Sequence, residues 1–430
     1  MTVNRQWTTQ RVGELCAKTK HALTGGPFGS NLVSRDYTDE GVPVIRGCNL
    51  PDSAPFSFDD QVFVSEKKAD SLRPNNAFPG DLIFTQRGTL GQVGIIPKDS
   101  PYSRFVISQS QMKLAVDTDK ADAWYLYYYF RLPSTVERIH SLAISSGVPH
   151  INLDILRKFQ VITPPVPIQR KITAIVSAYD ELIENNKRRI ALLEKMAEEI
   201  YREWFVRLRF PGHEEVNVVK GVPAGWQVLP FSQIVYVNPP ERIDKSEDIP
   251  FVAMEDLSLD SMFFAPKETR KGGQGAKFRN RDVLFPRITP SVENGKRGFV
   301  MTLEEGQAGF GSTEFIVMRE KVIGPEHIYF LSCSSDFRKH AELSMTGASG
   351  RQRVQEECFS FFLVKTPPSE IRIRFSEIVR PHFSQIHLLS RQIDHLTKTR
   401  DLFLPRLISG KLSVENLDIL FPPGMAGEAP

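Results

Sequence analysis

Residues 146–152 read SGVPHIN, and a related stretch, SGRQRVQ, occupies residues 349–355. Each stretch is followed at the same offset by the tripeptide Thr-Pro-Pro, at 163–165 and again at 366–368. The units of solenoid proteins are about 20–50 residues long, and this repeat is far longer than that. The sequence therefore predicts a duplicated domain whose two copies carry related surfaces for two different targets.

Length, composition and charge limit the possible classes of protein. With 430 residues, of which 41% are hydrophobic and 24% charged, we expect an ordinary globular chain of two to four domains. The net charge of +3 is small, so any surface that attracts nucleic acid must be local. The four cysteines show no metal-ligand spacing and are expected to be reduced thiols.

The sequence also predicts where the protein works. Residues 1–11 are polar and lack the apolar core of a signal peptide. The aromatic run at 123–130 is too short to span a membrane. We expect a cytoplasmic protein without a membrane partner.

Two long helices are predicted, and the first lies in a run without glycine or proline from Ile168 to Phe210. Its apolar residues alternate in steps of three and four, as in a coiled-coil seam, with Asn186 and Arg189 as polar interruptions. Pro381 is expected to kink or divide the second helix, which begins near Ser369, and Pro405 is expected to disturb its end. The expected seam residues are Ile172, Ile175, Tyr179, Leu182, Leu193, Met196 and Ile200 in the first helix, and Ile386, Leu389, Ile393, Leu396, Phe403 and Leu407 in the second.

Each predicted long helix has an apolar stripe on one side, and the simplest way to bury both stripes is to pack the two helices against each other. We therefore expect an α+β protein in which two β-rich domains are joined by two long helices, packed as an antiparallel coiled coil. The alternative is that each helix covers only its own domain. The expected parts are the first domain at 1–165, the central helix at 166–210, the second domain at 211–368, the C-terminal helix at 369–412 and a tail at 413–430.

Within the two domains, short apolar runs between turn residues predict strands. Examples are residues 42–45, 82–85 and 310–318. One helix is expected over 124–141 in the first domain, and its counterpart over 326–343 in the second.

Two patterns resemble enzyme motifs, and we discount both. Asn238-Pro239-Pro240 begins like the tetrapeptide with which amino-methyltransferases hold a flipped base, but Glu241 stands where an aromatic ring must stack. Asp52, Glu66 and Lys68 imitate the metal-binding set of a nuclease, although solvated charge is the simpler meaning.

No phosphate loop, glycine-rich turn for S-adenosylmethionine or metal-binding histidine pair is present in the sequence. We therefore expect a protein that is not an enzyme, without a cofactor, a metal or catalytic residues.

The remaining signal is a pair of donor-rich loops that follow the related segments DLIF (81–84) and DVLF (282–285). Arginine and glutamine hydrogen-bond base edges in a DNA groove, and glycine lets the backbone approach closely. The candidate DNA-binding residues are Gln86, Arg87, Thr89, Gln92 and Ser110 in the first copy, and Arg287, Thr289, Asn294, Lys296, Arg297, Thr313 and Arg351 in the second. Arg87 and Arg297 are the leading candidates.

The second copy also contains a basic segment at 267–297. It holds nine lysines and arginines but only three acidic residues. Such a segment attracts phosphates in a salt-dependent manner.

Several further motifs extend over nearly the whole chain. They are Ser146–Asn152 with Pro164, Pro165, Gln169 and Ile172; Glu184–Lys187 with Trp204 and Phe205; and Arg406–Leu412. With these motifs and two domains each followed by a long helix, the chain resembles the target-recognition layout of the specificity subunit of type I restriction–modification enzymes, and Pro381 is the departure from a straight helix pair.

This resemblance implies a non-catalytic subunit that binds double-stranded DNA. Each domain would read one half of a bipartite target, and the helices would set the gap between the halves. It also implies partners: two copies of an adenine methyltransferase subunit carrying S-adenosylmethionine, and ATP-dependent motor–nuclease subunits. Two alternatives remain open, namely a stand-alone DNA-binding protein that dimerises through its helices, and a nuclease that uses Asp52, Glu66 and Lys68.

Overall fold

The computed structural model describes residues 7–144, 147–244, 246–259, 261–348 and 350–421. Ser146 and Ser349 of the repeated stretch therefore lie outside the described residues. The chain forms two compact units. Unit 1 comprises Met1–Leu182 with Leu396–Pro430, and unit 2 comprises Ile183–His395. Both divisions fall inside long helices, so each unit contains one portion of each helix; the expected domain boundaries at helix ends stay a prediction.

In its described residues, unit 1 contains three sheets. The inner strands of its main sheet are fully buried, because runs such as LIFT offer an apolar side chain to each face. The sheets are β2 (Leu23–Gly25), β10 (Gln111–Leu114), β7 (Leu82–Thr85) and β8 (Val93–Ile95); β3 (Tyr37–Thr38), β5 (Val62–Val64), β4 (Val42–Ile45), β9 (Phe105–Ile107) and β6 (Asn76–Ala77); and β1 (Thr8–Arg11) with β11 (Gln160–Thr163). The helices outside the long pair are α1 (Glu66–Ser71), α2 (Ala123–Phe130), α3 (Pro133–Ser141) and α4 (Leu153–Lys158).

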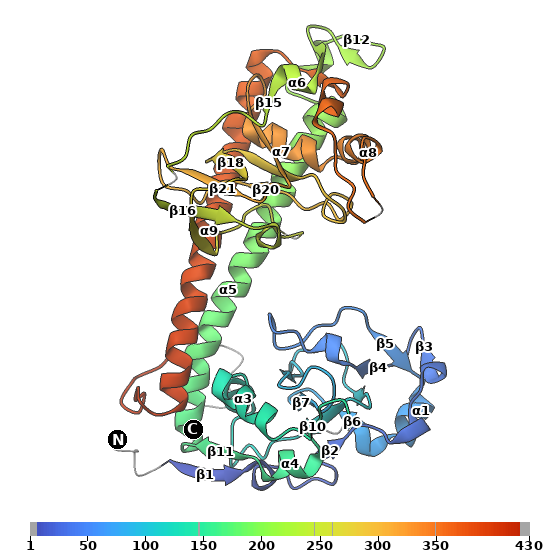
Figure 1. Ribbon diagram of the computed structural model, residues 1–430. Coiled ribbons are helices and arrows are strands. Elements are labelled where there is room, and N and C mark those ends of the chain that lie inside the picture. Colours follow the sequence, from blue (N-terminus) through green and yellow to red (C-terminus); the bar gives the residue numbers. More distant parts are fainter. Residues whose placement is uncertain (1–6, 145–146, 245, 260, 349, 422–430) are drawn as a thin grey trace. The chain divides into compact units, whose positions relative to one another are not determined.

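Unit 2 contains four sheets in its described residues (Figure 1). They are β15 (Val235–Val237), β22 (Phe315–Glu320), β19 (Val283–Pro286) and β20 (Gly298–Phe299); β17 (Glu268–Lys271), β16 (Asp248–Val252), β21 (Ala308–Gly311) and β18 (Ala276–Arg279); β14 (Gln227–Pro230) with β23 (Leu363–Thr366); and β12 (Val218–Val219) with β13 (Val222–Pro223). Its shorter helices are α6 (Phe231–Ile234), α7 (Pro325–Cys333) and α8 (Ser335–Leu343).

The two units repeat one topology, which confirms the duplication predicted from the sequence. The order β2-β10-β7-β8 in unit 1 corresponds to β15-β22-β19-β20 in unit 2. Each second sheet contains a parallel pair, β4 with β9 and β16 with β21, among otherwise antiparallel neighbours. Strand pairs β1–β11 and β14–β23 are likewise equivalent.

Two local predictions within the domains were wrong. The segment 310–318 is not one strand, because β21 ends at Gly311 and β22 begins at Phe315. Each predicted inner helix is two short helices. Pro133 begins α3, since the residue before a proline avoids helical geometry. In unit 2, extended Ser334 caps α8 by accepting from the Phe337 amide at 3.3 Å.

The first long helix, α5, runs from Val166 to Tyr201 and continues as a π-helical turn from Arg202 to Val206. Its buried stripe differs in part from the predicted seam: Leu182 and Met196 are exposed by 52% and 54%, and Arg189 is also exposed. The buried stripe includes Ile172, Val176, Ile183, Asn186, Ile190, Ala197 and Tyr201. Asn186 is thus the one predicted polar interruption that is buried.

The second long helix, α9, extends from Ser369 to Ile408. Pro381 and Pro405 lie within it, and neither divides it, so of the kink or division expected at Pro381 the division does not occur. A proline removes only one backbone hydrogen bond, whereas the surrounding turns bury Phe375, Val379, Phe383 and Ile386. This packing holds the helix together across the missing bond.

In each unit the two helix portions run in opposite directions. In unit 2 the ring centroids of Tyr201 and Phe375 are 6.3 Å apart, and Asn186 Nδ2 donates to Gln392 Oε1 at 3.4 Å. In unit 1 the rings of Tyr179 and Phe403 are 6.4 Å apart, and Arg400 Nη1 lies 2.5 Å from Asp180 Oδ1. No helix of the described residues is long and apolar enough to cross a membrane.

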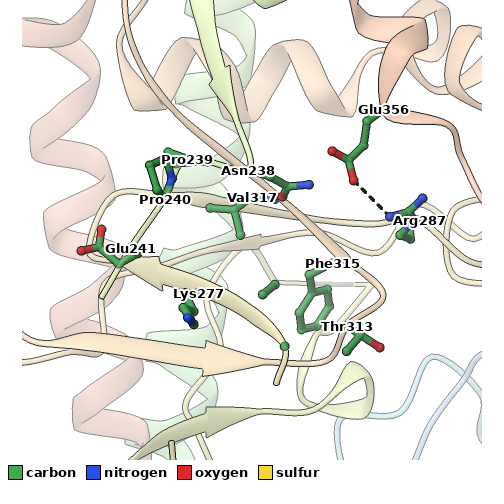
Figure 2. Close-up of a pocket in the computed structure, with 12 residues that line it drawn as sticks. Asn238, Pro239, Pro240, Glu241, Lys277, Arg287, Thr313, Phe315, Val317 and Glu356 are labelled. Atoms are coloured by element: carbon green, nitrogen blue, oxygen red, sulfur yellow. Dashed lines mark hydrogen bonds and ion pairs between the residues drawn. The ribbon is translucent and has the colours of Figure 1, made fainter. Parts of the chain in front are cut away.

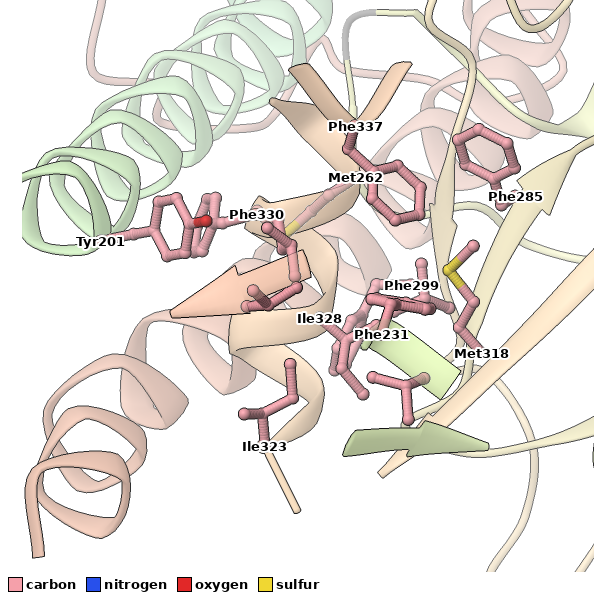
Figure 3. Packing of buried hydrophobic residues seen from close by; sticks show 14 of the residues in the cluster. Tyr201, Phe231, Met262, Phe285, Phe299, Met318, Ile323, Ile328, Phe330 and Phe337 are labelled. Carbon is pink, nitrogen blue, oxygen red and sulfur yellow. The ribbon is translucent and has the colours of Figure 1, made fainter. Parts of the chain in front are cut away.

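The main core of unit 2 is rich in aromatic side chains (Figure 3). The rings of Phe337 and Phe359 stack at 5.2 Å, and Phe285 meets Phe337 edge-on at 5.6 Å. Such pairs stabilise a core beyond the area they bury. In this core, side chains of β19 and β22 pack against side chains of α5, α7 and α9.

A buried histidine predicts a pH-dependent stability for this core. His327 is 2% exposed, its ring centroid lies 4.1 Å from that of Phe205, and burial, aided by the charge of Arg372, lowers its pKa from 6.5 to about 3. The unfolded chain therefore binds one more proton between about pH 3 and 6.5, so stability falls as the pH falls through that window. At pH 5 this contribution is about 2 kcal/mol.

We expect the free energy of unfolding of His327→Phe to depend less on pH between 7 and 5 than that of the wild type. Urea unfolding at both pH values measures the difference. His395→Gln, which changes an exposed histidine of the same unit, is the control and should keep the wild-type pH dependence. Equal slopes for His327→Phe and the wild type would contradict the assignment.

Candidate nucleic-acid interface

In unit 1 three loop segments meet beyond the end of β7. The Gln86 amide donates to the Ser110 carbonyl at 2.8 Å, and the Ile151 amide donates to the Gln86 carbonyl at 3.0 Å. Arg87 forms a backbone bridge with His150. Segments 86–92, 108–111 and 147–151 are therefore held side by side by their backbones.

Unit 2 contains the same junction, built from the equivalent segments. The Arg287 amide donates to the Glu314 carbonyl at 2.8 Å, and the Val354 amide donates to the Arg287 carbonyl at 2.8 Å. Ile288 forms a backbone bridge with Arg353. Gln86, Ser110 and His150 thus correspond to Arg287, Glu314 and Arg353, on the same backbone frame.

The unit 1 junction presents mostly neutral donors and acceptors. Arg87 and Thr89 are exposed, whereas Gln86, Gln92 and Ser110 are half-buried. Gln86 Nε2 donates to the Gln109 carbonyl, and Gln92 Oε1 accepts from Thr85 Oγ1 at 3.2 Å. The five candidates of this unit therefore lie in or beside one junction, and Arg87 is its exposed cation.

Gly91 lets the unit 1 loop pass close to a helix. Its φ is +87°, and an added Cβ would lie 2.7 Å from Cγ1 of Val136 in α3. An L side chain at this position would be strained and would clash. The loop that carries Arg87 and Thr89 is thereby fixed against the helix.

The unit 2 junction opens onto a cavity of about 490 Å³ (Figure 2). Arg287 lines the cavity, and its Nη1 lies 3.1 Å from Glu356 Oε1 while Nη2 donates to the Val354 carbonyl at 3.1 Å. Thr313, which is exposed, and Lys277 line it as well. The cavity can accept a polar group between a lysine and an internally bonded arginine.

The side chains of three other unit 2 candidates, Thr289, Lys296 and Arg297, are buried or hydrogen-bonded within the protein. Arg297 is 7% exposed, its Nε donates to the Ser332 carbonyl at 2.7 Å, and its guanidinium lies 5.9 Å from the ring centroid of Phe285. This inward position does not favour a contact to DNA for Arg297, one of the two leading candidates of the sequence, and its DNA contact stays a prediction. Lys296 Nζ donates to the Met254 carbonyl at 3.2 Å, and Thr289 Oγ1 is buried without a hydrogen-bond partner.

Three unit 2 candidates keep their side chains on the surface. They are Asn294, Thr313 and Arg351, which are all exposed. Sequence reasoning passed over Arg353, although its position opposite His150 in the repeat was visible. Arg353 belongs to the same junction as Arg287 and is also exposed.

The basic segment 267–297 is less free than its composition suggests. Lys267 lies 3.2 Å from Asp256, and Arg281 lies 3.5 Å from Glu320. Arg270 is paired with Glu268. Partial neutralisation by acidic side chains lowers the field that this segment contributes.

The patterns that resemble enzyme motifs have structural explanations. The Asn238 side chain accepts from the Val317 amide at 2.8 Å, which holds the loop after β15. Lys68 is paired with Asp36 at 3.1 Å, and Glu66 with Arg104. Among the residues that the structure describes, no three His, Cys, Asp or Glu side chains are grouped to hold a metal ion.

The sequence of this chain is similar to a known protein family and to several of its members. Residues 4–195 match the family model described as the type I restriction modification DNA specificity domain. The chain is 26% identical to the type I restriction enzyme MjaIX specificity subunit of Methanocaldococcus jannaschii over 372 residues, 82% of each protein. It is 28% identical over 185 residues to the EcoEI specificity subunit of Escherichia coli, which covers 41% of this chain and 30% of that protein.

A solved structure shares the fold. The crystal structure of the type I restriction–modification S subunit from M. genitalium matches with a TM-score of 0.60 and 17% identity, covering 94% of this chain and 96% of that chain. These findings confirm the family resemblance of the sequence: the chain is similar to type I specificity subunits over most of its length, and it shares the fold of a solved one.

Proposed function

We propose that this chain is the DNA sequence-recognition subunit of a type I restriction–modification complex. The observation that carries the proposal is the pair of equivalent junctions, because the same backbone frame holds neutral side chains in unit 1 and arginine–glutamate pairs in unit 2. One frame with two sets of base-reading groups is what a bipartite target requires. Each unit would read one half-site.

The long helices would act as the spacer between the half-sites. Their opposed contacts within each unit support an antiparallel coiled coil. The hydrogen bond from buried Asn186 to exposed Gln392 is a polar contact of the kind that fixes register in such helices. Two major-groove readers on one face of DNA need half-site centres about 34 Å apart, one helical turn.

The exposed surface of the helices would bind the partners. Leu182, Leu192 and Met196 of α5 are each more than half exposed, which suits a protein contact better than solvent. We assign this surface to two copies of an adenine methyltransferase subunit that carries S-adenosylmethionine, with ATP-dependent motor–nuclease subunits completing the complex. In this proposal the chain itself is not catalytic.

A stand-alone dimer joined through the helices is less well supported. The apolar stripe of α5 is already covered inside the chain, where Ile183, Ile190 and Ala197 are buried. A second copy would have to displace those contacts. Purification with a methyltransferase subunit separates the two cases.

The proposal is tested by a base-resolution methylome of cells that express this chain with its methyltransferase partner. We expect methylated adenine in a two-part motif with a fixed gap, present with the chain and absent without it. Unchanged methylation, with both proteins expressed and soluble, would refute the assignment.

A further inference from the structure

We propose that Arg353, oriented by Glu314, reads a guanine in the half-site bound by unit 2. The inference rests on the proposed function and names a base-contacting residue, its positioning residue and the base itself. Neither Arg353 nor Glu314 is among the DNA-binding candidates that were chosen from the sequence.

The equivalent residue in unit 1 defines the position in the junction. Arg353 bridges to Thr346 and to Ile288, as His150 bridges to Ile144 and to Arg87. A side chain at this position therefore leaves the same point of the frame in both units. The position lies beside the loop that follows β7 in unit 1 and β19 in unit 2.

One edge of the Arg353 guanidinium is occupied by Glu314. Nε lies 3.0 Å from each carboxylate oxygen, and Nη2 lies 2.7 Å from Oε1. The Glu314 carbonyl also accepts from the Arg287 amide, so the carboxylate is carried by a segment that the backbone fixes. The arginine is thereby held in one orientation before any ligand binds, which lowers the entropy lost on binding.

The opposite edge of the guanidinium remains available. Nη1 has one long contact, to the Arg351 carbonyl at 3.4 Å, and the Arg353 side chain is 44% exposed. Because each Nη carries two hydrogens, one N–H on Nη1 and one on Nη2 are left without a close partner in this geometry. Two parallel donors match O6 and N7 of guanine in the major groove.

The pairing is better explained by orientation than by stability. An ion pair in contact with solvent contributes little to folding stability, and both members of this pair are partly exposed. Unit 1 has Ser110 and His150 at the two positions, and His150 Nδ1 contacts the Val148 carbonyl at 3.2 Å. The guanine contact would therefore belong to one half-site only.

The test selects DNA from a randomised duplex library with the full chain bound to its methyltransferase subunit. The wild type should select a two-part motif with a guanine at one position of the unit 2 half-site. Arg353→Gln should lose that preference by about tenfold to one-hundredfold and shift it toward adenine, because glutamine pairs with adenine. The other half-site should not change.

Two further variants separate reading from folding. Glu314→Gln leaves Arg353 in place but removes its carboxylate, and should weaken the guanine preference while thermal melting stays near that of the wild type. Arg207→Gln removes another exposed arginine paired with glutamate in unit 2, and should select the wild-type motif.

An Arg353→Gln variant that keeps the guanine, or that loses affinity equally for all sequences, would overturn the inference and leave the proposed function standing. A wild-type complex without any sequence preference would overturn both.

Discussion

Arg319→Met is expected to lower the free energy of unfolding of unit 2 by about 3–5 kcal/mol, because it leaves a carboxylate buried without its counter-charge. Arg319 Nε and Nη2 lie 2.7 and 2.6 Å from the two oxygens of Asp282, whose side chain is 1% exposed. Arg319 Nη1 also lies 2.8 Å from Glu241. Thermal and urea unfolding measure the loss.

The pH dependence of this loss identifies its cause. Burial already raises the pKa of Asp282, and the hydrogen bond from Arg319 opposes that shift. Without Arg319 the pKa should rise further, so the destabilisation should shrink as the pH falls and Asp282 becomes neutral. Arg338→Met removes a partly exposed pair with Glu342 and should cost no more than about 1 kcal/mol. A similarly small loss for Arg319→Met would contradict the prediction.

Lengthening both long helices by one heptad should change the gap of the recognised sequence and leave its half-sites intact. Seven residues add about 10.5 Å of helix, which corresponds to about three base pairs of DNA. The insertions would follow Arg189 in α5 and Leu389 in α9, which lie on the same side of the polar contact between Asn186 and Gln392 because the helices are antiparallel. We expect a gap longer by about three base pairs, or loss of binding where the added twist cannot be accommodated.

The matched control places the heptad in α5 alone. This variant shifts one apolar stripe against the other and should abolish specific methylation. The methylome of cells expressing each variant gives both results. A changed half-site with an unchanged gap would show that the helices are not the spacer.

Much of the fold was predictable because it rests on local signals. The absence of glycine and proline after Ile168 predicts a long helix, and α5 is one. The repeated Asp-x-x-Phe segments predict equivalent strands, which are β7 and β19. What failed depended on packing at a distance. The seam could be drawn through Met196 or through its neighbour, and only the tight contact around fully buried Ala197 decides between them.

The candidate site was predictable as a set of segments but not as a set of side chains. The equivalence of His150 and Arg353 follows from the repeat, and the structure confirms it. Whether an arginine turns inward depends on acceptors far along the chain, such as the Ser332 carbonyl that binds Arg297. Glu314, which fixes Arg353, likewise lies on another strand connection. Neither partner can be chosen from spacing alone.

Unit 1 is built from segments near both ends of the described chain. Lys171 in α5 donates to the Glu415 carbonyl at 2.8 Å, and Leu407 and Val414 lie in the same core as Val12. An added Cβ on Gly410 would lie 3.2 Å from the Trp7 ring. The first and last described segments thus complete one unit together, and unit 2 is formed by the stretch of chain between the two parts of unit 1. A circular permutation opened after α5, near Pro211 and Gly212, would therefore retain every contact described in unit 1.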